Sequence, residues 1–139
     1  SRGVHDFYRC HRVTVDLPRQ GRFTVVVVDI RSQPWLPRGP VLRDILAAAT
    51  SDQRSVIIGD FNTPPDSRWF RNWRDCGFHL ANDAPRRGFR ETWAHGLPLL
   101  TLDHVWLSSA WLGVSSQKSH HGSDHARVKC IVENINQGN

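Results

Sequence analysis

The stretch Ser55-Val-Ile-Ile-Gly-Asp-Phe-Asn62 joins an apolar run to a polar end. Residues 55–58 predict a short strand buried on both faces, and Gly59 permits a sharp exit from it. Asp60 and Asn62 are two positions apart, so in extended backbone their side chains point to the same side. A carboxylate that orients water and an amide that donates to a phosphoryl oxygen would then converge. A simple turn cap explains the same spacing as well.

The residues before this stretch predict a hairpin and a helix. Residues 11–17 alternate like a half-buried strand, and residues 18–21 have the composition of a turn. Residues 22–30 contain four consecutive valines, which is typical of a central strand covered on both faces. Residues 41–50 carry apolar side chains at helical spacing, with Pro40 near the first turn of the predicted helix.

The residues after Asn62 predict a helix, an irregular region and two strands. A helix is expected over residues 67–76, capped by Asp66 or Ser67 and ended by Gly77. Residues 79–100 look irregular. Strands are expected over residues 102–107 and 127–133, and the second follows a loop that is rich in histidine.

Polar pairs stand at the start of both later strands. Asp103-His104 opens the first, and a polar strand end facing solvent is the alternative to a site. Asp124-His125 precedes the second. Asp124 could ligate a metal, and His125 could exchange a proton near neutral pH. Each pair by itself is a weak signal.

The composition suits a globular domain with an anionic partner. The 139 residues carry a formal charge of +5, with a pI near 9.9. Such a balance fits nucleic acid, phospholipid head groups or a phosphorylated small molecule, with plain solubility as the alternative. The three cysteines are dispersed, which argues against a zinc or redox centre. No apolar run reaches the ~18 residues of a membrane helix.

Three segments taken in order carry a family resemblance. GDFN at 59–62, LDHVWLS at 102–108 and SDH at 123–125 together resemble the endonuclease/exonuclease/phosphatase superfamily of deoxyribonuclease-I-like metal phosphoesterases. Thr92-Trp93 is similar to the Thr-Trp element of the family. The resemblance runs from about Phe23 to Val132. It implies an α/β (α+β) fold, a partial four-layer α/β/β/α sandwich with a mixed, mostly antiparallel sheet.

The resemblance also implies a role for each matching residue. Asp60 would position or activate the attacking water, and Asn62 would hydrogen-bond the scissile phosphate. Asp103 would orient His125, which would contact the phosphate and stabilise the in-line transition state. Asp124 would help to bind a divalent metal, Mg²⁺ or Mn²⁺. The expected function is therefore metal-dependent hydrolysis of phosphate esters, as a phosphodiesterase, nuclease or phosphatase.

Two departures from the family pattern leave an alternative open. Family members are usually much longer, and their metal-binding Glu in a Gln-Glu motif is not seen here. Residues 1–139 are thus expected to be one domain, the C-terminal portion of a parent domain. Asp29-Ile30 stands where many members have His-Leu, and an anionic Asp29 would repel phosphate. The alternative is a catalytically incomplete fragment that binds phosphate-containing ligands or partners without turnover.

The expected partners follow from these two readings. They are a phosphate-ester substrate such as nucleic acid or phospholipid, the N-terminal half of the parent domain, and a second copy paired through an exposed sheet edge. Several basic side chains outside the motifs could touch phosphates. A solvated surface or an ordinary loop is the stronger expectation for each of them: Arg38, Arg43, Arg86, Arg87, Arg90, His120 and His121.

Overall fold

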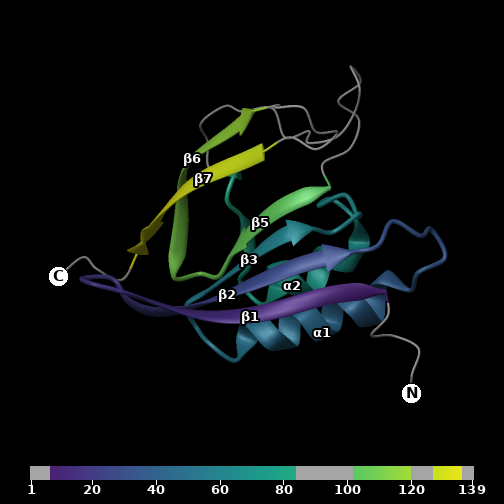
Figure 1. Cartoon of the computed structure of the whole chain (residues 1–139), viewed down its shortest axis with the longest axis horizontal. Helices are drawn as coiled ribbons and strands as arrows, with labels where there is room; N and C mark the ends of the chain where they lie inside the picture. Colours follow the sequence, from purple (N-terminus) through teal and green to yellow (C-terminus); the bar gives the residue numbers. More distant parts are fainter. Residues whose placement is uncertain (1–6, 84–101, 120–126, 136–139) are drawn as a thin grey trace.

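The computed structural model describes residues 7–83, 102–119 and 127–135 (Figure 1). The elements within these ranges form two sheets and one layer of helices. In chain order they are β1 (Tyr8–Leu17), β2 (Gly21–Ile30), α1 (Arg38–Thr50), β3 (Ser55–Asp60), the 3-10 turn η1 (Arg68–Phe70), α2 (Arg71–Asp75), β4 (His79–Leu80), β5 (Asp103–Leu107), β6 (Trp111–Ser119) and β7 (Arg127–Asn134).

The larger sheet has five strands in the order β1-β2-β3-β5-β4. β1 and β2 form the predicted antiparallel hairpin, paired from Tyr8 with Ile30 to Leu17 with Gly21. β2 and β3 run parallel, with α1 as the connection between them. All other pairings among the described strands are antiparallel. The predicted mixed, mostly antiparallel sheet is therefore confirmed.

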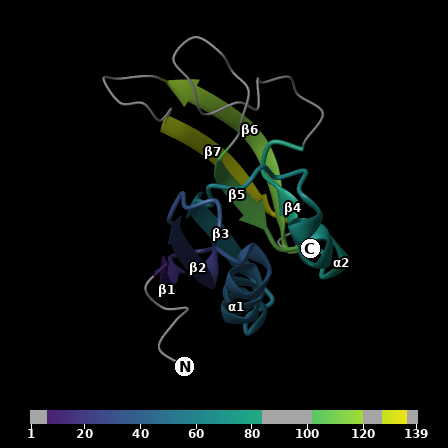
Figure 2. The same ribbon diagram turned by 90° about the vertical axis from the view of Figure 1, so that its right-hand side faces the viewer.

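The helices cover one face of this sheet (Figures 1 and 2). α1 begins at Arg38, three residues before the predicted start, because a proline is tolerated in the first helical turn. The helix expected over residues 67–76 divides into η1 and α2. The Ser67 side chain caps its start, and Gly77 follows with a φ of +86°.

Aromatic side chains fill the space between the helices and the sheet. Phe61, Phe70, Trp73 and Trp106 are each at most 1% exposed. Their ring centroids lie 4.9–5.8 Å apart in the contacting pairs, mostly edge to face. Burial of each such ring contributes roughly 1.5–3 kcal/mol. This core lies directly beneath the end of β3.

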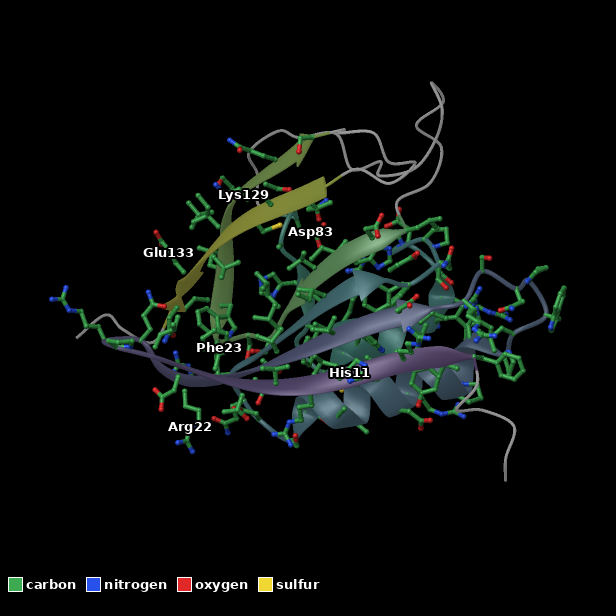
Figure 3. All side chains as sticks on the ribbon, in the orientation of Figure 1. His11, Arg22, Phe23, Asp83, Lys129 and Glu133 are labelled. Atoms are coloured by element: carbon green, nitrogen blue, oxygen red, sulfur yellow. The ribbon has the colours of Figure 1, made fainter. Side chains whose placement is uncertain are left out.

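A second sheet of two strands, β6 and β7, lies across the other face of the first (Figures 1 and 2). Trp111 and Leu107 are buried there, with Cys130 and Val132 of β7 packed beside them. Phe23 meets Trp111 with ring centroids 5.0 Å apart, while Lys129 and Glu133 point away from the first sheet (Figure 3). The described residues thus make an α/β/β arrangement, with no second helical layer among them.

The face under β6 and β7 is only partly covered. Val27 of β2 is 38% exposed and Val13 of β1 is 47% exposed. The expectation that both faces of β2 are covered is therefore wrong for Val27, although Val26 and Val28 on the helix side are buried. β2 adjoins the edge strand β1, and residues of β7 line the space beside β2, β3 and β5. No helix in the described ranges is long and apolar enough to span a bilayer.

Candidate active site

Three aspartates stand in register at one end of the larger sheet. Asp29 pairs with Asp60 across the parallel strands β2 and β3, and Asp60 pairs with Asp103 across β3 and β5. β2 and β3 end at the same edge, and β5 starts there because it runs the other way. Polar groups of different strands meet at such an edge, where α/β folds place their ligands. The sheet therefore brings Asp60 and Asp103 together and adds Asp29.

Gly59 lies within β3, one residue before its end, and pairs with Val28 and His104. Its φ is +143°, and a Cβ there would lie 1.8 Å from the carbonyl oxygen of Val28. A side chain cannot be accommodated at that distance, since it would have to displace the backbone of β2. The position thus requires glycine because of the close approach to β2. The sharp exit expected at Gly59 is wrong, since β3 continues through Asp60.

Asp60 and Asn62 meet through a turn rather than through extended backbone. Asn62 has a left-handed φ of +44°, so the expected alternation along a strand is wrong at this position. Its backbone N–H donates to Asp60 Oδ1 at 2.8 Å, the pattern of an Asx turn. Its side-chain Nδ2 donates to Asp60 Oδ2 at 3.1 Å and to the carbonyl of Ile30 at 2.6 Å. The amide therefore fixes the carboxylate and ties β3 to the end of β2.

Phe61, between these two residues, anchors the turn in the aromatic core. Its ring is fully buried and stacks on His104 at 4.8 Å with an interplanar angle of 11°. His104 is 3% exposed, and its Nδ1 accepts a hydrogen bond from Trp106 Nε1 at 3.2 Å. The alternative of a solvent-facing polar strand end is therefore wrong for His104. Its neighbour Asp103 lies on the opposite face of β5, because side chains alternate along a strand.

Arg38 lies next to this cluster and is not the solvated residue that the sequence favoured. Its guanidinium donates to the carbonyls of Arg31 at 2.9 Å and Gln33 at 3.4 Å. Burial lowers the pKa of Arg38, and the nearby charge of Asp60 opposes that change. The guanidinium is thus close enough to interact electrostatically with Asp60, the central carboxylate of the row. Arg43, in contrast, is exposed as expected.

A cavity of about 430 Å³ separates the two sheets beside the acidic row. Gly59, Asp103 and His104 line one end of it, and aliphatic side chains of β2, β3, β5 and β7 form its walls. The cavity has a polar end at the candidate site and an apolar remainder. Such a lining is common for small-ligand sites in proteins.

The described residues do not by themselves form a metal site. Aspartate oxygens are ligands that Mg²⁺ and Mn²⁺ accept. Within residues 7–83, 102–119 and 127–135, however, no three His, Cys, Asp or Glu side chains are arranged to hold a metal ion. The expected metal ligand Asp124 and the expected catalytic His125 lie outside the described residues, as do Thr92-Trp93, Arg86, Arg87, Arg90, His120 and His121.

Sequence reasoning missed the positions of two charged residues in this cluster. In the sequence Asp29 is only a departure from a family pattern, yet in the fold it is the register partner of Asp60. Both residues end strands that precede loops, so a parallel pairing of those strands would have indicated their proximity. Arg38 carried no such signal, because its place depends on the fold of residues 31–37.

Solved structures with this fold were found at low sequence identity. A functionally unknown conserved protein from Enterococcus faecalis V583 aligns with a TM-score of 0.69 and 16% identity, over 81% of this chain and 50% of that one. The human Nocturnin catalytic domain with bound sulfate aligns with a TM-score of 0.62 and 15% identity, over 94% of this chain and 61% of that one. D. rerio TDP2 complexed with a single-strand DNA product aligns with a TM-score of 0.64 and 12% identity, over 94% of this chain and 70% of that one.

These alignments establish the fold, and the family follows from the sequence match. The chain spans about half of the length of the E. faecalis protein. No curated protein matches the sequence. Residues 3–125 match the family described as Endonuclease/Exonuclease/phosphatase family. The chain therefore belongs to the endonuclease/exonuclease/phosphatase family.

Proposed function

We propose that this chain hydrolyses phosphate esters by in-line attack of water, with a divalent metal as cofactor. The observation that carries the proposal is the Asp60 carboxylate, held by two hydrogen bonds from Asn62 at the sheet edge where Asp103 is its register partner. Membership of the family supports the reaction class. The sulfate in the Nocturnin structure and the DNA product in the TDP2 structure support an anionic phosphate ligand.

Asp60 is proposed to orient the attacking water and to accept its proton. Both of its oxygens already accept a hydrogen bond from Asn62, so its carboxylate is fixed before a ligand arrives. This preorganisation lowers the entropic cost of placing the water. Asn62 would contact the phosphate only after releasing the bond to Ile30 or to Asp60 Oδ2, because its amide nitrogen donates to both.

The other members of the predicted set keep the roles that the family resemblance implies. Asp103 is proposed to orient His125, and His125 to donate to the phosphate. Arg38 offsets part of the negative charge of the row and so reduces repulsion of an anionic substrate. Mg²⁺ or Mn²⁺, held by Asp124 with other carboxylates, would stabilise negative charge on the phosphoryl oxygens.

The test is hydrolysis of bis(p-nitrophenyl) phosphate with Mg²⁺, with Mn²⁺ and with a chelator. Asp60→Ala is expected to lower kcat by at least about 100-fold, the contribution of a positioned general base. Asp75→Ala removes an exposed carboxylate at the end of α2 and serves as the matched control with unchanged turnover. Turnover that survives Asp60→Ala or the chelator would contradict the proposal.

A second candidate function is weak phosphate binding without turnover, because Asp29 stands where many family members have His-Leu and its charge opposes a tightly held phosphate. The carboxylate of Asp29 stands directly beside Asp60, where a further negative charge disfavours an anionic ligand. If wild type shows no turnover, isothermal calorimetry with inorganic phosphate distinguishes binding from inactivity. Asp29→His is expected to tighten phosphate binding under this second function, and unchanged affinity would argue against it.

A further inference from the structure

Two tryptophans near the candidate site are exposed, in contrast to those of the core. Trp35 is 76% exposed and Trp69 is 40% exposed, while Trp73 and Trp106 are buried. Trp35 lies between β2 and α1, and Trp69 lies in η1. An exposed tryptophan ring leaves a large apolar surface in water, which lowers stability relative to burial. Such rings are frequent where a protein binds a partner.

The turn that carries Trp35 is fixed by its neighbours. The Leu36 N–H donates to the carbonyl of Gln33 at 3.2 Å, and the Leu36 side chain is buried in the core. Arg38 donates to the carbonyls of Arg31 and Gln33, which closes the turn from the other side. The backbone that carries Trp35 is therefore held by hydrogen bonds on both sides, and its ring is presented to solvent.

Trp69 is held against the start of α1 with an arginine on its ring. A Cβ at Gly39 would lie 3.0 Å from the Trp69 ring, so the ring rests on the helix backbone. The guanidinium of Arg68 lies 4.7 Å from the ring centroid, in a cation–π contact. The Ser67 hydroxyl accepts from the Trp69 N–H at 3.5 Å. The Trp69 ring thus packs on the start of α1 and carries the Arg68 guanidinium over it.

This surface is continuous with the acidic row. Asn62 of the candidate site donates to the carbonyl of Ile30, the residue directly before Arg31. Arg38 bonds the carbonyl of Arg31 and also lies within electrostatic range of Asp60. Gly39, next in the chain, touches Trp69. A chain of contacts therefore leads from Asp60 to Trp69, and through Arg38 and Gln33 to the turn that carries Trp35.

The chemistry of this surface fits bases and phosphates better than a bilayer. Single-stranded nucleic acids bind where bases stack on aromatic rings and cations track the backbone. A loop that inserts into a membrane instead presents several adjacent apolar side chains. Pro34, Pro37 and the exposed Arg31 adjoin Trp35 here, and Leu36 is turned into the core. The net charge of +5 also favours a polyanion.

We propose that Trp35, Trp69 and the flanking arginines 31, 38 and 68 form a stacking platform that binds single-stranded nucleic acid beside the candidate site. Single-stranded nucleic acid would then be the substrate class of that site, an inference that rests on the proposed function. DNA and RNA share the chemistry, and the test separates them.

The experiment is fluorescence anisotropy of two labelled 12-mers, oligo(dT) and oligo(rU), titrated with the full chain in chelator so that no hydrolysis occurs. Trp35→Ala is expected to weaken binding of the preferred strand about tenfold, the loss of one stacked base. Trp35→Phe keeps a ring and is expected to retain most of the affinity. Leu112→Ala removes an exposed side chain on β6 as the matched control.

The outcomes separate this proposal from the proposed function. Trp35-dependent binding without any turnover of a phosphodiester would support the platform and contradict the catalytic proposal. Turnover with equal oligonucleotide affinity in wild type and Trp35→Ala would overturn the platform and leave the catalytic proposal standing. Trp35-dependent binding to phosphatidylserine vesicles, with no oligonucleotide binding, would also overturn it in favour of a membrane.

Discussion

The two faces of the five-stranded sheet differ in how completely they are packed. On the helix side, aromatic rings and aliphatic side chains close a dry core in which Val26, Ile57 and Trp106 are fully buried. On the other side, β6 and β7 cover β3 and β5 but leave Val13 and Val27 partly exposed. The acidic row lies at the end of this open face.

Because of this difference, a single strand contains both residues that stabilise the core and residues that belong to the candidate site. In β5, His104 and Trp106 belong to the core, whereas Asp103 belongs to the candidate site. The turn after β3 does the same, since Phe61 anchors a core and its neighbours Asp60 and Asn62 carry polar groups. A site built on such strands is held by packing beneath it and not by its own bonds alone.

The largest effect is expected for Gly59→Ala, which changes a position where β3 and β2 approach closely. The new Cβ would meet the Val28 carbonyl, and we expect a loss of about 4 kcal/mol or more in the free energy of unfolding, measured by urea denaturation with circular dichroism. Gly77→Ala is the control, because its Cβ is no closer than 3.7 Å to another atom. Only the left-handed backbone cost of about 1–2 kcal/mol remains there. Equal losses would mean that the close approach of β3 to β2 is absent.

Adjacent valines of β2 compare the two faces directly. Val26→Ala is expected to cost about 2 kcal/mol, since Val26 is fully buried among the helices. Val27→Ala is expected to cost less than about 1 kcal/mol, since Val27 is 38% exposed. Both losses in the free energy of unfolding are measured by the same urea denaturation experiment. Similar costs for the pair would show that the open face is covered in solution, for example by a second copy.

A smaller effect of opposite sign is expected for Asp29→Asn. The substitution removes one of two like charges that are register partners, so stability should rise by about 0.5 kcal/mol at neutral pH. Asp16→Asn on β1 is the control, because it removes an exposed charge that lies 3.8 Å from Arg22. A lower stability of Asp29→Asn would indicate that Asp29 makes a favourable contact with Arg9, its partner on β1.

The smallest effect concerns the three thiols and leaves the fold unchanged. Burial raises the pKa of Cys10 and also that of Cys130, where a hydrogen bond with Ser116 partly opposes the change. Cys76 is exposed. Iodoacetamide at neutral pH should therefore label Cys76 first, as followed by peptide mass spectrometry, and raising the pH should speed labelling of the other two. Early labelling of Cys10 would mean that β1 detaches from the core.

The sequence predicted the elements with strong periodicity and missed those that depend on distant partners. The valine run and the helix at Pro40 are local signals, and both are found within a few residues of the expected bounds. β6 was missed because WLGVSSQKS has little apolar character of its own. It becomes a strand through pairing with β7 and through Gly113, whose Cβ would lie 2.0 Å from the Ala81 carbonyl.

The candidate site was predicted in its residue types but not in its bonds. GDFN and LDH marked Asp60, Asn62 and Asp103, and their roles remain predictions. The left-handed Asn62 and the second acceptor of its amide, Ile30, could not be predicted, because they depend on where β2 ends relative to β3. The placement of Arg38 depends in the same way on the turn that precedes α1.

The strand order has a consequence for synthesis on the ribosome. β5 lies between β3 and β4, although it follows both in the chain. The growing chain therefore exposes one hydrogen-bonding edge of β3 until residues 103–107 emerge, and β4 has no described strand to join before then. At about 5–20 residues per second this interval lasts several seconds. An apolar edge open for that time invites pairing with other nascent chains, so the yield of native protein should depend on translation speed between Asp60 and Leu107.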